Sequence, residues 1–260
     1  MNIPPEAEIP LSARQLQIRI GERVLCRRLD LEFLPGQCWG LLGRNAAGKT
    51  TLLHTLAGLR PAAAGQVLLD DRPILAQRRR AIARRLGLLL QERAPAFPAS
   101  VRDTVLTGRY PHLGFWRGCG PNDHALADDA IRQAGLAGLE TRNVQTLSGG
   151  ERQRTAIAVL LAQAAQMMLL DEPVTHLDLR EQERILRLCR DLADRGRLLI
   201  MSLHDPNQAL RHCTHLLMLH RGRALHGETV RIGTQRLLSR LYAQPLTALR
   251  GPRGPVMVPY

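Results

Sequence analysis

The sequence predicts an α/β protein: a parallel sheet covered by helices, preceded by an N-terminal antiparallel β element and interrupted by a mostly helical insertion. Three observations predict this class. Continuous apolar runs alternate with helical patterns in both halves of the chain, which is typical of buried parallel strands. Residues 92 to 147 replace that alternation with helical segments punctuated by proline. At the N-terminus, short apolar segments on either side of a turn predict the antiparallel element.

The first third of the chain contains strands with one helix between them. Short apolar strands and a turn between residues 11 and 37 are expected to form the antiparallel element, and the apolar run at 38–43 predicts the first buried strand. Residues 50–59 then repeat apolar side chains with the period of a helix. A strand and turn follow at 65–74, and a further buried strand ends at Gln91.

The last third resumes the alternation after the insertion. Helices and strands are predicted in turn at 151–164, 167–173, 180–196, 197–205, 206–213 and 215–223. We expect one domain over residues 11–246, with a core at about 11–91 and 155–246 and a helical insertion at about 92–154. Residues 247–260 are expected to form a tail.

The chain is strongly basic, with a formal charge of +13 and a pI near 11. Such a surface attracts nucleic acids and anionic membranes. However, aromatic residues that stack on bases make up only 3% of the chain. Arginine also replaces lysine everywhere except at Lys49, which indicates a coding bias and weakens any inference from arginine abundance.

The cysteines and the apolar runs indicate the cellular compartment in which the protein is expected. The five cysteines are scattered, odd in number and never arranged as C-x-x-C, so neither a zinc site nor a disulfide framework is predicted. A reducing cytosol fits this pattern best. The N-terminus has no signal-peptide pattern, and no apolar run approaches the roughly 20 residues of a membrane span. Any role at a membrane is therefore expected to be peripheral.

Residues 43–50, GRNAAGKT, match the phosphate-loop pattern G-x-x-x-x-G-K-[ST] between an apolar strand and a helix. Backbone N–H groups and a helix N-terminus bind anions in such a loop, while the lysine reaches the terminal phosphates. The hydroxyl of Thr50 stands where a ligand of Mg²⁺ is expected. The nucleotide-binding residues predicted here are Gly43, Arg44, Asn45, Ala46, Ala47, Gly48, Lys49, Thr50 and Thr51.

Two further motifs carry carboxylates and glycines. The buried strand MMLLDEP releases Asp171, a candidate for Mg²⁺ or its water shell, and Glu172, which would lie beside the terminal phosphate. The segment LSGGERQR places Ser148, Gly149 and Gly150 at a helix start, a second anion-binding end. Two phosphate cradles in one chain suggest two chains that face each other, each gripping the nucleotide of its partner.

These motifs, with LLLQ, THLD and SLHD in the same order, resemble the nucleotide-binding subunit of ATP-binding cassette (ABC) transporters. The resemblance covers roughly residues 11–230. It implies a RecA-like P-loop NTPase core and a head-to-tail homodimer that sandwiches two ATP molecules with Mg²⁺. It also implies integral-membrane permease subunits as partners, a periplasmic or surface substrate-binding protein acting through them, and a place on the cytoplasmic face of the bacterial inner membrane.

The resemblance also implies a role for individual residues. Glu172 would be the general base, His204 would contact the γ-phosphate, and Gln91 would sense Mg²⁺ and the attacking water. Ser148, Gly149, Gly150 and Glu151 would form the signature that meets the partner's ATP. Asp178 would lie in the loop through which the two subunits communicate. His176, at a variable position, is assigned no role.

Two departures from the family pattern concern the nucleotide. The family usually has glycine where Ala46 stands, and if the backbone there needs a positive φ, alanine costs about 1 to 2 kcal/mol. The family often has an aromatic residue near 18–21 that stacks on adenine, whereas this chain has Ile20. Adenine would then lie on an aliphatic surface, with looser base selectivity.

Finer resemblance, in the segments after Gln91 and around the signature, points to importers of iron-siderophore complexes, haem or cobalamin. Another transporter class remains an alternative. A further alternative is a DNA-maintenance ATPase of the same superfamily, but those proteins carry a long coiled coil, and only 57 positions separate Gln91 from Ser148. No nucleic-acid partner is therefore expected. The aromatics of the insertion would either face the permease or pack the insertion's own core; they are Phe97, Tyr110, Phe115 and Trp116.

Overall fold

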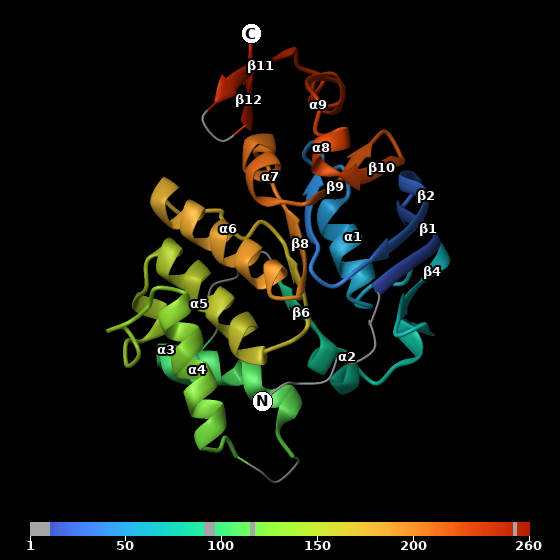
Figure 1. Ribbon diagram of the computed structural model, residues 1–260. Helices are drawn as coiled ribbons and strands as arrows, with labels where there is room; N and C mark the ends of the chain where they lie inside the picture. The colour runs from blue at the N-terminus through green and yellow to red at the C-terminus, as the bar shows by residue number, and fades with distance from the viewer. Residues whose placement is uncertain (1–10, 91–96, 115–117, 252–253) are drawn as a thin grey trace. The chain divides into compact units, whose positions relative to one another are not determined.

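The computed structural model describes residues 11–90, 97–114, 118–251 and 254–260 (Figure 1). The contacts between Cα atoms divide the chain into two compact units. Unit 1 consists of Met1–Gln77 and Cys189–Tyr260, and unit 2 consists of Arg78–Leu188. Gln91, Phe115 and Trp116, for which the sequence predicts roles, lie outside the described residues.

Unit 1 contains an antiparallel sheet with the strand order β2-β1-β4-β5. Its strands are β1 (Leu11–Ile20), β2 (Arg23–Phe33), β4 (Ala64–Leu69) and β5 (Arg72–Pro73). Strand β1 pairs with β2 in a register that joins Leu11 to Phe33, and its other edge pairs with β4. This sheet confirms the predicted N-terminal antiparallel element.

Unit 1 also contains strands in the order β10-β9-β3-β8. They are β3 (Cys38–Leu42), β8 (Leu198–Ser202), β9 (His215–His220) and β10 (Arg223–Glu228). Strand β3 pairs in parallel with β8 and with β9, and β10 closes the edge as an antiparallel neighbour of β9. Every residue of β3 and β8 is buried, as expected from their continuous apolar runs.

The helices of unit 1 connect these strands. They are α1 (Lys49–Leu56), α7 (Pro206–His212), α8 (Thr229–Ile232) and α9 (Gln235–Tyr242), with a 3₁₀ turn, η1, at Ile74–Ala76. Helix α6 (Leu179–Asp194) begins in unit 2 and ends in unit 1. The side chain of Asp205 caps α7 and that of Thr234 caps α9, so both helices begin where the sequence offers an acceptor for the first free N–H groups.

A small aromatic cluster lies at the base of β3. The rings of Trp39 and His215 are stacked with their centroids 4.7 Å apart, and Phe33 meets Trp39 edge to face at 5.2 Å. The indole N–H of Trp39 donates a hydrogen bond of 2.8 Å to Gln37. Strands β2, β3 and β9 are thus joined by the packing of one side chain from each, next to the strand that leads into the phosphate loop.

The C-terminal residues form a hairpin in unit 1. Strands β11 (Leu246–Gly251) and β12 (Gly254–Pro259) pair antiparallel, and β12 lies beside α7 (Figure 1). The segment predicted as a tail thus has regular structure. Its core residue Met257 is buried, and its backbone is hydrogen-bonded to Asn207.

Unit 2 is mostly helical. Its elements are α2 (Arg79–Arg85), β6 (Leu86–Leu89), α3 (Val101–Leu106), η2 (Thr107–His112), α4 (Pro121–Gln133), η3 (Val144–Thr146), α5 (Gly149–Gln163) and β7 (Met167–Leu170). Helices α3, α4 and α5 contact one another, and the short strands β6 and β7 pair in parallel. The helical segments predicted between residues 92 and 147 therefore form α3 and α4.

An ion pair joins the helices of unit 2. The Arg109 guanidinium donates a hydrogen bond of 2.8 Å to the Asp123 carboxylate at the start of α4. It also donates one of 2.9 Å to the carbonyl of Ala162 near the end of α5. The two side chains are only 8% and 16% exposed. Arg109 thus ties η2, α4 and α5 together.

The α/β class predicted from the sequence is confirmed by these strands and helices. Among the helices of the described chain, none combines the length and the apolar character that crossing a bilayer requires. The boundaries proposed for a core and an insertion, at residues 91 and 155, stay predictions.

Candidate functional site

The phosphate loop joins β3 to α1 in unit 1. The loop leaves the sheet after Leu42, and α1 begins at Lys49. Gly48 has a φ of 103°, and a Cβ there would lie 2.8 Å from Cδ1 of Leu25, so both the backbone angle and the close packing require glycine. The α1 N-terminus has no side-chain cap, which leaves N–H groups for an anion.

Lys49 turns its side chain into the loop. It is 6% exposed, and its ammonium donates a hydrogen bond of 3.0 Å to the carbonyl oxygen of Gly43. This hydrogen bond holds the ammonium between the two ends of the phosphate loop. A phosphate entering the loop would meet a compact cation at its centre, as the sequence predicts.

Ala46 adopts the left-handed conformation, with a φ of 58°. The backbone at residue 46 thus has the positive φ that glycine adopts without penalty and alanine does not. The alanine stores about 1 to 2 kcal/mol of strain in the loop. Strain of this kind concentrates at sites that bind ligands.

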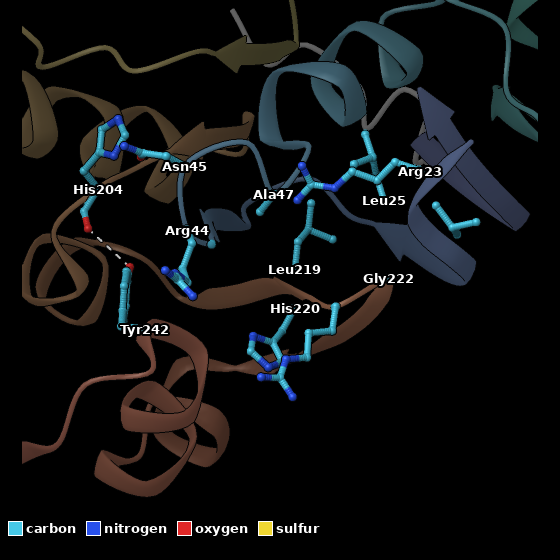
Figure 2. Close-up of a pocket in the computed structure, with 13 residues that line it drawn as sticks. Arg23, Leu25, Arg44, Asn45, Ala47, His204, Leu219, His220, Gly222 and Tyr242 are labelled. Atoms are coloured by element: carbon cyan, nitrogen blue, oxygen red, sulfur yellow. Dashed lines mark hydrogen bonds between the residues drawn. The ribbon is translucent and has the colours of Figure 1, made fainter. Parts of the chain in front are cut away.

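A cavity of about 620 Å³ opens beside the loop within unit 1 (Figure 2). Its lining comes from the start of β2, the phosphate loop, the end of β9 and two separate side chains. The residues are Arg23, Val24, Leu25, Gly43, Arg44, Asn45, Ala47, His204, Leu219, His220, Arg221, Gly222 and Tyr242. Among these described residues none is acidic, whereas three are arginines and two are histidines. The cavity therefore favours a polyanion.

His204 lies at the carboxyl end of β8. The N–H of Leu203 donates to the Leu41 carbonyl of β3 at 3.2 Å, which holds the loop after β8 next to the strand that carries the phosphate loop. Figure 2 shows His204 and Tyr242 lining the same cavity as Arg44, with a hydrogen bond from the Tyr242 phenol to the His204 carbonyl. The structure thus brings the predicted His204 to the predicted phosphate loop.

Unit 2 carries the acidic motif. The backbone N–H of Asp171 donates a hydrogen bond of 3.0 Å to the carbonyl of Leu89 on β6, and the residue is 1% exposed. Glu172, which follows, has a φ of 51°. The side-chain amide of Gln153 on α5 donates to the carbonyls of Glu172, at 3.3 Å, and Pro173, at 3.0 Å. These bonds hold an unfavourable backbone conformation where the sequence predicts a catalytic carboxylate.

The signature segment begins α5. Ser148 caps the helix by accepting from the N–H of Glu151 at 3.2 Å, and the Glu151 carboxylate accepts from the N–H of Ser148 at 2.7 Å. The hydrogen bond from the Ser148 backbone lowers the pKa of Glu151, so this side chain is charged and engaged as a cap. Glu151 therefore shapes the helix start.

The glycines of the signature are not explained by packing within the chain. A Cβ on Gly149 would lie 3.7 Å from Cβ of His176, and one on Gly150 would lie 3.4 Å from its carbonyl oxygen. Both are ordinary van der Waals distances. Packing within the chain therefore does not by itself require glycine at either position.

Asp178 caps another helix. Its carboxylate accepts a hydrogen bond of 2.9 Å from the N–H of Glu181 in the first turn of α6. Within the chain, Asp178 therefore acts as the N-terminal cap of α6 and positions the loop that precedes this helix.

Sequence reasoning missed several residues of the cavity. Arg23, His220 and Arg221 come from strand ends that carry no motif, and Tyr242 comes from a segment with no distinguishing pattern. Only the fold brings them beside residue 43. Ile20, which the sequence places near adenine, is an exposed residue at the end of β1.

Comparisons with known proteins agree on the family. The family model for ABC transporters matches residues 26–175. The hemin import ATP-binding protein HmuV of Streptomyces coelicolor is 38% identical, over 96% of this chain and 90% of that protein. The ferric enterobactin transport ATP-binding protein FepC of Escherichia coli is 36% identical, over 98% of this chain and 95% of its own.

Solved structures extend the agreement to the fold. An inward-facing metal-chelate type ABC transporter superposes with a TM-score of 0.83 at 28% identity, covering 97% of this chain and 98% of its own. The ADP conformation of the ATP-binding cassette MJ1267 superposes with a TM-score of 0.77 at 19% identity, over 92% of this chain and 98% of its own, and supports the fold alone. The chain therefore belongs to the ABC transporter family, as an ATP-hydrolysing subunit.

Proposed function

We propose that this chain powers the import of a metal chelate, of the iron-siderophore, haem or cobalamin type, by hydrolysing ATP. The observation that carries the proposal is the similarity to import ATP-binding proteins along 96% and 98% of the chain. The names of those relatives favour haem and ferric siderophores among the three. The basic cavity beside the phosphate loop would supply the nucleotide site that such a subunit needs, because its lining includes three arginines and no acidic residue.

The nucleotide phosphates would be held by residues 43–51 in unit 1, with Lys49 as the central cation. The hydroxyl of Thr50 and the carboxylate of Asp171 are oxygen donors of the kind that Mg²⁺ takes, and Gln91 would add an amide oxygen. When bound, Mg²⁺ supplies charge neutralisation on the phosphate oxygens. His204 would contact the γ-phosphate from the cavity that it lines.

Glu172 would take the proton of the attacking water. A general base needs a carboxylate held in a fixed direction, and the left-handed backbone of Glu172 is held by two hydrogen bonds from Gln153. Phosphoryl transfer requires little covalent chemistry from the protein, so most of the catalysis would come from positioning and charge.

The active state would be a homodimer. Ser148, Gly149, Gly150 and Glu151 would grip the ATP bound to the partner subunit, and Asp178 would lie where the two subunits communicate. The position of these residues at the start of α5, where free N–H groups of a helix bind anions, supports this role. Replacing Ser148 with arginine should block the closed dimer, so ATP-dependent dimerisation of the Glu172→Gln variant should disappear when Ser148→Arg is added.

A permease in the inner membrane would receive this subunit on its cytoplasmic side, together with a substrate-binding protein beyond the membrane. The insertion offers exposed aromatic rings for that contact: Phe97 is 80% exposed and Tyr110 is 61% exposed. These two rings do not pack a core of the insertion. Large rings on a surface are frequent anchors of protein interfaces.

The test is reconstitution of the chain with its permease in liposomes. ATP hydrolysis should rise when a binding protein loaded with haem or with a ferric siderophore is added on the opposite side. Unloaded binding protein is the control. Hydrolysis that responds to no chelate, or tight binding of duplex DNA at physiological salt without a permease partner, would contradict the proposal.

A further inference from the structure

Tyr242 and His204 meet although 38 positions separate them. The phenolic O–H of Tyr242 donates a hydrogen bond of 3.2 Å to the carbonyl oxygen of His204, and both residues line the cavity beside the phosphate loop (Figure 2). Tyr242 is the last residue of α9, and Ala243 ends the helix with a φ of 53°. The end of a C-terminal helix therefore contacts the loop that carries the histidine.

The phenol is suited to act as a permanent donor. Burial raises the pKa of Tyr242, and the nearby carboxylate of Asp205 raises it further. The group therefore stays protonated at any pH at which an ATPase works. A carbonyl oxygen can only accept, so the direction of the bond is fixed.

The loop after β8 is held from a second side by the C-terminal hairpin. The amide of Asn207 donates a hydrogen bond of 3.0 Å to the carbonyl of Met257 and accepts one of 2.7 Å from the N–H of the same residue. Asp205 caps α7 through a bond of 2.8 Å from the N–H of Asn207. Residues 204–207 thus lie between two attachments from the C-terminal segment.

The two attachments belong to one connected segment. The N–H of Leu246 in β11 donates to the hydroxyl of Ser239 in α9 at 3.0 Å, and the N–H of Ala248 donates to the side chain of Gln235 at 3.4 Å. Pairing of β11 with β12 completes the connection. The two attachments of residues 204–207 are therefore connected to each other through α9, β11 and β12.

We propose that Tyr242 is a positioning residue for ATP hydrolysis: with α9 and the strands β11 and β12, it orients the His204 peptide so that the imidazole reaches the γ-phosphate. This rests on the role proposed above for His204. His204 is exposed and lies outside regular structure, and the hydrogen bond from Tyr242 holds its peptide. A group that stabilises a transition state needs placement within about 0.5 Å, which neighbouring hydrogen bonds provide.

The test compares steady-state ATP hydrolysis of the full chain and its variants. Tyr242→Phe removes one oxygen atom and keeps the ring, so kcat should fall about 3- to 10-fold, the range of one hydrogen bond. KM for ATP should change less than about 2-fold, because binding by residues 43–51 is untouched. Tyr260→Phe is the matched control: this tyrosine follows β12, lies outside the elements that hold His204, and is 79% exposed, so the variant should hydrolyse ATP like the unmodified chain.

Two more variants separate positioning from a general loss of structure. Asn207→Ala removes the second attachment and should also lower kcat. Adding Tyr242→Phe to His204→Ala should cause no further loss, because the phenol acts through the histidine. Thermal unfolding of each variant identifies any that fails to fold.

The outcomes distinguish the two proposals. If the unmodified chain hydrolyses no ATP, or if His204→Ala keeps full activity, the role of His204 is wrong and the positioning proposal falls with it. If His204→Ala is impaired but Tyr242→Phe matches the control, only the positioning proposal is overturned. It is also overturned if Tyr242→Phe slows the His204→Ala variant by the same factor as the unmodified chain.

Discussion

The ammonium of Lys49 donates a hydrogen bond of 3.0 Å to the carbonyl oxygen of Gly43, six residues upstream in the same loop. Lys49 is the single lysine of a chain with 36 basic residues of the lysine and arginine types. A loop closed on its own first carbonyl has room for a compact charge with three donors. The broad planar guanidinium of arginine does not match that space.

Lys49→Arg should therefore impair hydrolysis although it keeps the charge. We expect a fall on the order of 10²-fold in turnover, since misplacing a catalytic contact by about 1 Å has that effect. Phosphate release at saturating ATP measures it. Arg60→Lys, on the exposed surface after α1, is a control that exchanges the same two residue types. Full activity of Lys49→Arg would show that charge alone suffices.

Glu172→Gln should leave ATP binding intact and slow turnover by roughly 10²- to 10⁴-fold, because the amide cannot accept the proton of water. Binding is measured by equilibrium titration with ATP and turnover by phosphate release. Glu22→Gln, at a fully exposed carboxylate, serves as the matched control. Unchanged hydrolysis in Glu172→Gln would remove the residue from the role of general base.

Ala46→Gly should stabilise the protein by about 1 kcal/mol, because glycine adopts the φ of 58° without strain. In a chain of this size that corresponds to a rise of about 2 to 4 °C in Tm. Ala47→Gly is the control. Ala47 is not among the positive-φ residues of the described chain, so glycine there relieves no strain and should lower the stability. A lower Tm for Ala46→Gly would mean that the alanine methyl group makes contacts that outweigh the strain.

Asp123→Asn should destabilise unit 2 by about 1 to 3 kcal/mol, because the buried Arg109 guanidinium loses its charged acceptor. Asp129→Asn, in a pair whose carboxylate is 50% exposed, should lose less than about 1 kcal/mol. Urea denaturation followed by circular dichroism measures both. Equal losses would show that burial adds nothing to the Arg109 pair.

The same pair predicts a pH dependence. The hydrogen bond from Arg109 lowers the pKa of Asp123 below its ordinary value of 3.8, so the folded state holds the proton less tightly than the unfolded state. Stability from this group is then complete above pH 3.8 and is lost as the pH falls further through the folded pKa. The difference in unfolding free energy between the unmodified chain and Asp123→Asn should shrink in that range, and a constant difference would contradict the assignment.

Local patterns predicted much of this molecule because they act over short distances. The loop at residues 43–50 is encoded by its glycines and lysine, and the start of α5 by Ser148 and Glu151, three residues apart. The apolar runs of β3 and β8 likewise predict strands by themselves. Each of these features depends only on neighbours in the chain.

Other features depend on residues that the sequence separates. Nothing near Tyr242 indicates that its phenol meets a carbonyl 38 positions away. The hairpin of β11 and β12 has no alternating pattern strong enough to predict it, and Asn207 contributes to its docking from 50 positions upstream. The left-handed backbone of Glu172 is held by Gln153 on α5, so the residues next to Glu172 in the sequence do not predict this strained conformation.

The stacking of Trp39 on His215 gives this protein a built-in optical probe. Only two tryptophans are present, so Trp116→Phe leaves Trp39 as the single indole emitter. Its ring is buried at the foot of the strand leading to the nucleotide loop, in contact with the imidazole of His215. Its emission therefore reports on the packing around β3 without any added dye.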